Sequence, residues 1–160
     1  MIKINVITNN NKWLNYIKKP NYYLDKKISK LNSKEKKFKK KQIFCTLLLS
    51  GSKEIRYLNK KFRKKNKATD VLSFPFQTKK ELKKKLKTEK EIYLGDIIIN
   101  LNKIKSKNEK FFFETEFDRL WIHGLVHLFG HDHKKDKDFK IMRQVEKNYL
   151  DLVNDWKISK

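Results

Sequence analysis

The chain has 160 residues, and its 41 Lys and Arg residues against 18 Asp and Glu residues give a formal net charge of +23. This length suits a single domain, expected to span residues 1–160, with a buried core of its own. One cysteine excludes a disulfide framework within the chain. With no signal-peptide pattern and no run near about 18 apolar residues, we expect a cytoplasmic protein that does not contact membranes.

The positive charge predicts a polyanionic partner, because each phosphate neutralised by Lys or Arg releases condensed counterions. Nucleic acid is the polyanion that fits best. Nearly all the basic residues are lysines, since arginine occurs only at positions 56, 63, 119 and 143. A genome rich in A and T would produce such an excess of lysine unaided. The charge therefore supports a nucleic-acid partner without establishing one.

The first third of the chain predicts a strand, a helical segment and a second strand. Residues 3–6 alternate polar and apolar side chains, as in an edge or half-buried strand. Residues 13–31 have helical spacing, and Pro20 is expected to break or kink them into one helix or two short ones. Residues 42–49 are β-rich and apolar, which indicates a central strand with Cys45 in the core.

The middle of the chain alternates helical and extended patterns. Ser52 as N-cap and an acidic first turn predict a helix to about Phe62. Residues 63–69 indicate a polar, basic loop, and residues 71–76 indicate a short strand. Pro75 is expected to end that strand or to place it at a sheet edge.

The next segment is rich in lysine. Residues 79–90 predict a helix or a loop, and a solvated run of charge is the favoured interpretation. Residues 94–99 predict a strand buried on both faces, and Asn100 is expected to start a basic helix. Strands and helices are thus mixed along the chain. The predicted fold class is α+β, a single domain with a small mixed β-sheet packed against helices.

Two helices are predicted at the C-terminal end. The first begins near Glu114 or Glu116 and runs to Phe129; the second spans about residues 136–155 and packs on the sheet or on the first. The buried stripe expected on the first comprises Phe117, Leu120, Trp121, Leu125 and Leu128. The stripe expected on the second comprises Phe139, Met142, Val145, Tyr149, Leu152 and Val153.

All four histidines lie between positions 123 and 133, which predicts a metal site. His123 and His127 are four residues apart, so on a helix their rings share one face. Gly130 can adopt the left-handed conformation that ends a helix and turns the chain back, bringing in His133. The spacing H-x-x-x-H-x-x-G-x-x-H is typical of a metzincin-type zinc site, in which three imidazoles leave a fourth position open. We expect one Zn²⁺ ion.

The third ligand has an alternative, because His131 competes with His133. Gly130 is expected to break the helix before His131, so His133 is preferred and His131 is placed at the rim. Asp132 is interpreted either as an acceptor for a ligand imidazole or as a solvated turn carboxylate. The alternative for the whole cluster is a set of incidental polar residues at a helix end.

Gly124 stands where metalloproteases of the H-E-x-x-H type carry their general base, so a peptidase lacks its base here. Glycine within a helix costs about 1 kcal/mol relative to alanine. Its presence indicates that something approaches this face of the backbone closely. Substrate and a packed neighbouring element are the two candidates.

Three segments together resemble the YbeY family of bacterial endoribonucleases. They are residues 63–76 (RKKNKATDVLSFPF), residues 94–97 (LGDI) and the histidine cluster with its H-G-x-x-H-L-x-G-x-D-H pattern. The resemblance covers about residues 40–150. One departure is His131, where tyrosine is commoner in the family.

The resemblance implies a metal-dependent hydrolase of phosphodiester bonds that holds zinc on His123, His127 and His133. It implies single-strand-specific cleavage in the maturation of the 3′ end of 16S rRNA and in ribosome quality control. Arg63 falls on the family's functional arginine, and a guanidinium can hold a phosphate through two hydrogen bonds. We therefore expect Arg63 and His123 to be catalytic. The 16S rRNA precursor in the small subunit, a ribosomal protein and an assembly GTPase are the expected partners.

Two other functions stay open at this stage. The chain could be a ribosome-assembly factor that binds RNA and keeps a mainly structural zinc, or a metalloprotease, against which Gly124 argues. The general base of the hydrolase is not assigned. Two alternatives are open: metal-activated water needs no base, or Asp132 or His131 assists.

Overall fold

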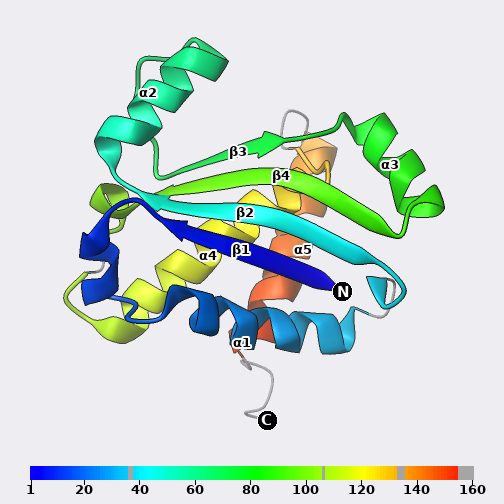
Figure 1. Cartoon of the computed structure of the whole chain (residues 1–160), viewed down its shortest axis with the longest axis horizontal. Helices are drawn as coiled ribbons and strands as arrows, with labels where there is room; N and C mark the ends of the chain where they lie inside the picture. The colour runs from blue at the N-terminus through cyan, green and yellow to red at the C-terminus, as the bar shows by residue number, and fades with distance from the viewer. Residues whose placement is uncertain (36–37, 106, 133–135, 155–160) are drawn as a thin grey trace.

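The fold consists of one four-stranded sheet and the helices packed around it, as the computed structural model of the chain shows (Figure 1). It describes residues 1–35, 38–105, 107–132 and 136–154. In chain order the elements are β1 (Ile2–Thr8), the 3-10 helix η1 (Asn11–Asn15), α1 (Pro20–Lys34), β2 (Gln42–Ser50), α2 (Ser52–Arg63), β3 (Val71–Pro75), α3 (Lys79–Thr88), β4 (Glu91–Asn100), the 3-10 helix η3 (Leu101–Lys103), α4 (Lys110–Leu128) and α5 (Asp136–Asn154).

The sheet is mixed, with strand order β1-β2-β4-β3. β1, β2 and β4 run parallel, and β3 pairs antiparallel with β4 at the far edge. The prediction of an edge strand near the N-terminus and a central strand at residues 42–49 is confirmed. Pro75 ends β3 on a sheet edge, where its missing N–H costs no ladder hydrogen bond. The α+β fold class is likewise confirmed.

Most of the core lies between the sheet and the layer formed by α1, α4 and α5, which in Figure 1 lie behind and below the strands. All five apolar residues predicted to face the core from the histidine helix are buried. A smaller cluster on the opposite face, formed by Ile55, Leu72 and Ile98, packs α2 on β3 and β4. Burial raises the pKa of the Cys45 thiol to about 12, so this cysteine is an inert core residue, as predicted.

The histidine helix begins at Lys110, earlier than predicted. Phe113 supplies the reason, because it is buried against rings from the N-terminal segment. Its ring centroid lies 4.7 Å from that of Tyr16 in a stacked arrangement and 6.1 Å from that of Trp13. These partners are far away in the sequence, so the local pattern of α4 does not reveal them.

The helical pattern of residues 13–31 is broken just before Pro20 into η1 and α1, as predicted, and Pro20 is the first residue of α1, where its fixed φ suits the helix. Three other predicted boundaries were wrong. The N-cap of α2 is Gly51, and Arg63 is the last residue of that helix, not part of the loop. Asn100 caps only the short η3.

Residues 79–88 form α3, so the helix is the correct one of the two predicted alternatives, and most of its lysines are exposed, as expected of a solvated run of charge. Thr78 accepts from the backbone N–H of Glu81, and the Glu81 carboxylate accepts from the backbone of Thr78. This capping box starts α3, and Leu82 is buried in the main core.

Phe139 on α5 was predicted to be buried, but it is 45% exposed.

Gly95, in the Leu-Gly-Asp segment, makes a bulge in β4 opposite β2. Its φ is 131°, and an added Cβ would lie 2.1 Å from the backbone oxygen of Phe74. Only glycine fits this position.

The described helices include none that is long and apolar enough to cross a bilayer.

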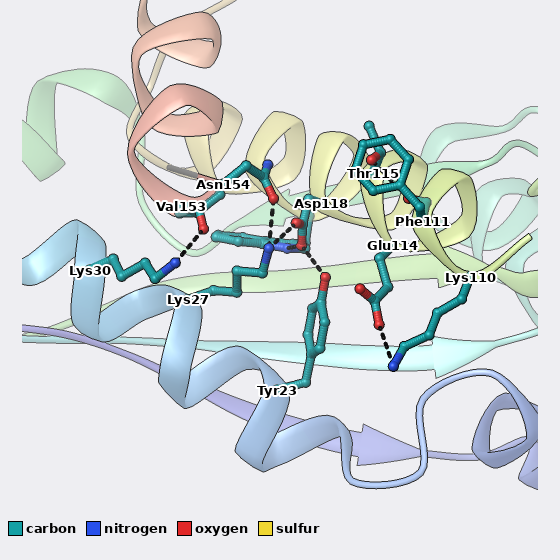
Figure 2. Close-up of polar contacts among 11 residues, drawn as sticks. Tyr23, Lys27, Lys30, Lys110, Phe111, Glu114, Thr115, Asp118, Val153 and Asn154 are labelled. Atoms are coloured by element: carbon teal, nitrogen blue, oxygen red, sulfur yellow. Dashed lines mark hydrogen bonds and ion pairs between the residues drawn. The ribbon is translucent and has the colours of Figure 1, made fainter. Parts of the chain in front are cut away.

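A buried carboxylate ties α4 to the two helices beside it (Figure 2). Asp118 is fully buried and accepts from Lys27 Nζ at 2.8 Å, Tyr23 OH at 3.0 Å and Trp121 Nε1 at 2.9 Å. Lys27 Nζ also donates to Asn154 Oδ1 of α5 at 2.6 Å. Burial, with the Asp118 charge nearby, raises the pKa of Tyr23, which stays a neutral donor.

Replacing Asp118 by alanine is expected to lower the free energy of unfolding by about 3 kcal/mol, because a mostly buried ammonium and two further donors lose their acceptor. Asp118→Asn keeps the size and one oxygen and should cost less. Chemical denaturation at neutral pH measures both variants. A loss below about 1 kcal/mol for the alanine variant would contradict the role given to this carboxylate.

Candidate metal centre and the groove around it

Two histidine rings meet at the C-terminal end of α4. His123 Nε2 and His127 Nε2 lie 3.1 Å apart. Their ring centroids are 4.5 Å apart, and the ring planes are inclined at 85°. The four-residue spacing thus places both rings on one helix face, as predicted. The His123 side chain keeps 29% of its surface exposed, so the pair is accessible from solvent.

Each ring is oriented by a partner on its other nitrogen. His123 Nδ1 lies 2.6 Å from Glu146 Oε1 of α5, and His127 Nδ1 lies 3.0 Å from the backbone oxygen of His131. Carboxylate and carbonyl oxygens only accept hydrogen bonds, so Nδ1 is the donor in both rings. In each neutral ring, Nε2 is therefore the nitrogen with the lone pair.

The two Nε2 lone pairs face one another across 3.1 Å, an arrangement that is repulsive unless a cation or a proton lies between them. In a tetrahedral zinc site with Zn–N bonds of about 2.0–2.1 Å, two ligand nitrogens lie about 3.3 Å apart. Ligand imidazoles also characteristically donate through the second nitrogen to a carboxylate or a backbone carbonyl. The pair therefore fits two ligands of one metal ion.

Gly130 ends α4 as predicted, with a φ of 84°. Its N–H donates to the oxygen of His127 at 2.9 Å, and the N–H of His131 donates to the oxygen of Val126 at 3.3 Å. These are the two bonds of a Schellman turn. The turn brings the carbonyl of His131 against the His127 ring, so residue 131 orients this ring through its backbone.

His133, the predicted third ligand, lies outside the described residues. Within residues 1–35, 38–105, 107–132 and 136–154, no group of three or more His, Cys, Asp or Glu side chains is placed to hold a metal ion. The complete ligand set, and the preference for His133 over His131, stay predictions.

Glu146 is the site residue that the sequence prediction missed. Asp132 was the carboxylate considered as an acceptor for a ligand ring, but the acceptor at His123 is Glu146. A signal was present, because Glu146 borders the apolar stripe of α5, next to Val145 and one turn before the buried Tyr149. A carboxylate at the edge of a buried stripe is placed to contact the helix on which that stripe packs.

The histidine pair opens into a groove of about 900 Å³. Its walls come from the end of α2 and the following loop, from β3, from the start of α3 and from the end of α4. The charged and polar lining includes Arg63, Lys65, Thr69, Asp70, Ser73, Gln77, Lys79, His123, His127, His131, Asp132 and Asp138. The fold thus places Arg63 on the same groove as the histidines, although α2 and α4 are far apart in the sequence.

The position of Arg63 is fixed by the turn that follows it. Lys64 adopts a left-handed conformation with a φ of 58° and ends α2. The loop then returns along the helix, held by Asn59 Nδ2 donating to the oxygen of Lys67 at 2.7 Å. Elsewhere in the groove lining, Gln77 Oε1 is buried without a hydrogen-bond partner in the described part of the chain. A polar group entering the groove could satisfy it.

Comparison with known proteins identifies the family. The profile of the family described as Endoribonuclease YbeY matches residues 7–154. The Endoribonuclease YbeY of Pelagibacter ubique (strain HTCC1062) is 45% identical over 148 residues, which cover 91% of this chain and 92% of that protein. The chain belongs to the YbeY family. The resemblance read from three motifs is thereby confirmed.

Other relatives extend the match beyond those motifs. The YbeY protein of Ehrlichia canis (strain Jake) is 33% identical over 155 residues, covering 96% of this chain and 93% of that protein. The similarity to YbeY proteins therefore includes the N-terminal third. A solution structure of a Thermotoga maritima protein is 27% identical, with a TM-score of 0.59, and the match covers 98% of this chain and 92% of that one.

Gly124 owes its place in this YbeY chain to packing. A Cβ at this position would lie 2.6 Å from Ile97 Cγ2, and both residues are fully buried. The element that approaches the backbone at Gly124 is therefore β4. Of the two candidates, substrate and a packed neighbouring element, the packed element is correct. The glycine lets the histidine helix sit directly on the sheet.

Replacing Gly124 by alanine is expected to destabilise the protein by about 1–3 kcal/mol through overpacking, despite the better helix propensity of alanine. Ile97→Ala removes the clashing atoms. In a double-mutant cycle followed by chemical denaturation, Gly124→Ala should cost less stability in the Ile97→Ala background than in the unaltered protein. Strictly additive effects of the two changes would show that the clash does not matter.

Proposed function

We propose that this chain is a zinc-dependent endoribonuclease that cuts single-stranded RNA. It acts in the cytoplasm on the 16S rRNA precursor, in maturation of the 3′ end and in quality control of the small ribosomal subunit. The observation that carries the proposal is the pair of Nε2 lone pairs facing each other in a groove that also holds Arg63. Membership of a family of endoribonucleases supports RNA as the substrate.

His123 and His127 would hold the ion, with His133 as the proposed third ligand. When bound, zinc supplies Lewis-acid chemistry, lowering the pKa of a water at its open position toward about 7 and polarising a phosphoryl oxygen. Glu146 and the carbonyl of His131 keep both rings in the ligand tautomer and in place. They also raise the basicity of the ligands.

Arg63 is proposed to bind the phosphate at which the strand is cut. Its guanidinium is permanently charged and can donate two parallel hydrogen bonds to one phosphate, which a lysine cannot do. It would orient the scissile phosphate and offset the charge that develops there. Arg63→Lys keeps the charge but not this geometry, so it tests the two-bond contact specifically.

The groove also offers groups for the rest of the substrate. Lys65 and Lys79 can contact neighbouring phosphates, and Gln77 Oε1 can accept from a ribose hydroxyl or a base amino group. Asp132 and His131 line the groove beside the ligand turn and are the candidates for a group that takes a proton. A ribosomal protein and an assembly GTPase are proposed as partners on the family resemblance.

Purified protein is expected to lose cleavage of a labelled single-stranded RNA after chelation, confirmed by elemental analysis, and to regain it when zinc is restored. His123→Ala, His127→Ala and His133→Ala should each abolish stoichiometric zinc, whereas His131→Ala should retain it. The last variant is the matched control, because it removes an imidazole from the same cluster and keeps the backbone carbonyl.

The results also separate the alternatives. Cleavage that is indifferent to verified metal removal would overturn the proposal. Zinc binding and rRNA binding without cleavage by any preparation would favour an assembly factor with a structural zinc. Loss of zinc in His131→Ala, with retention in His133→Ala, would exchange the two ligand assignments.

Replacing Glu146 by alanine should weaken zinc binding about 10–100-fold, because the His123 ring loses the acceptor that fixes its tautomer. Glu146→Gln keeps an acceptor oxygen and should fall between that variant and the unaltered protein. Competition with a fluorescent chelator measures the affinity. Gln144→Ala, on an exposed part of the same helix, is the control, and an equal effect there would exclude a specific role for Glu146.

A further inference from the structure

A second groove, of about 1010 Å³, lies between α1 and the start of α4. It shares no lining residue with the histidine groove. Along α4, thirteen residues separate Lys110 from His123, which corresponds to about 20 Å of helix. Figure 2 shows part of it, with Tyr23 and Lys27 on α1 opposite Glu114 and Lys110 on α4.

The groove is strongly basic. Lys26 and Lys30 lie one turn apart on the face of α1 that lines the groove, Lys19 is the N-cap of this helix, and further lysines come from both ends of the groove. The lining lysines are Lys18, Lys19, Lys26, Lys27, Lys30, Lys107 and Lys110. Among the described residues of the lining, Glu114 is the one carboxylate, and it pairs with Lys110 at 3.9 Å. The charge that remains is positive.

Aromatic rings alternate with these lysines. Tyr22 lines the groove and is 69% exposed, so its ring face is accessible. Tyr16 also lines the groove, and its ring is held rigidly by stacking on Phe113, with an interplanar angle of 13°. A basic groove that follows a backbone, with aromatic rings on which bases stack, is how proteins bind single-stranded nucleic acid without sequence preference.

A neighbouring groove shows that lysine alone does not create this combination. It has a similar volume, about 1080 Å³, and its lining includes Lys3, Lys39, Lys40 and Lys90. Its described lining also includes two carboxylates, Asp25 and Glu91, and one half-buried aromatic ring, Phe44, but no tyrosine. A genome-wide bias toward lysine would fill both grooves with positive charge. Of the two, the groove at α1 is the one with an exposed aromatic ring, Tyr22, and with a single, paired carboxylate among its described lining residues.

We propose that the groove between α1 and the start of α4 is a second binding site for single-stranded RNA. It holds a stretch of the substrate at a distance from the cleavage site. The choice of RNA, rather than an acidic protein, rests on the proposed function and on the stacking rings. From Lys19 to Lys30 the groove follows about 16 Å of helix, enough for a few nucleotides. A long strand could reach both grooves, whereas a short one occupies one at a time.

The test compares two variants with the same change of charge. One carries Lys18→Gln, Lys19→Gln, Lys26→Gln and Lys107→Gln; the control carries Lys3→Gln, Lys39→Gln, Lys40→Gln and Lys90→Gln. Fluorescence anisotropy measures binding of a labelled oligouridylate of about thirty nucleotides to metal-free protein, over a range of salt concentrations. Circular dichroism melting verifies that both variants fold.

The first variant should bind this strand at least about tenfold more weakly at physiological salt. Its binding should also depend less on salt, with the magnitude of the slope of log K against log salt smaller by up to about 3. The control should stay within about twofold. Tyr22→Ala should weaken binding several-fold, and Tyr22→Phe should restore it, since stacking needs the ring and not the hydroxyl. Cleavage of an oligonucleotide of about eight nucleotides should be unchanged in all of these variants.

Equal losses in the two charge variants would overturn the proposal, because the lysines would then act only through net charge. Displacement of RNA by polyglutamate of equal charge, as effectively as by unlabelled RNA, would also overturn it in favour of a general polyanion site. Binding is measured without metal and without cleavage. Failure of the proposed nuclease activity therefore leaves this result interpretable.

Discussion

The orientation of the histidine pair depends on two hydrogen bonds made by the Nδ1 atoms, on the side of each ring that faces away from the other ring. Glu146 accepts from His123 Nδ1, and the carbonyl of His131 accepts from His127 Nδ1. Together they turn two Nε2 lone pairs toward one point, 3.1 Å apart, which is unfavourable without a cation. One acceptor comes from another helix and the other from the turn made by Gly130. The site is therefore assembled by tertiary packing as much as by the histidine motif.

The scaffold explains how these acceptors are held in place. Gly124 lets α4 sit directly on Ile97 of the sheet, which fixes the depth of the histidine helix. Asp118 joins α4 to α1 through Lys27, and Lys27 in turn contacts Asn154 of α5. The helix that presents Glu146 is thus anchored by the same buried network. Loss of that network would disturb the proposed metal centre without changing any of its proposed ligands.

The sequence predicted those features whose causes are local. The spacing of the histidines, the helix end at Gly130 and the sheet strands follow from periodicity and from backbone preferences, and all are observed. The missed features depend on distant partners. Phe113 extends α4 because Tyr16 stacks on it, and Glu146 reaches His123 only because α5 packs on α4. Arg63 was linked to the histidines through family resemblance, since no local pattern joins α2 to α4.

The ring tautomers provide the most direct test of the central claim. Long-range proton–nitrogen NMR correlation spectra of metal-free protein at neutral pH distinguish Nδ1–H from Nε2–H in each histidine. Both His123 and His127 should carry a proton on Nδ1, with any further proton shared between their Nε2 atoms, and stoichiometric zinc should displace that proton and shift the Nε2 resonances while Nδ1 stays protonated. An Nε2–H tautomer in either ring of the zinc-loaded protein, or coordination through Nδ1, would contradict the account.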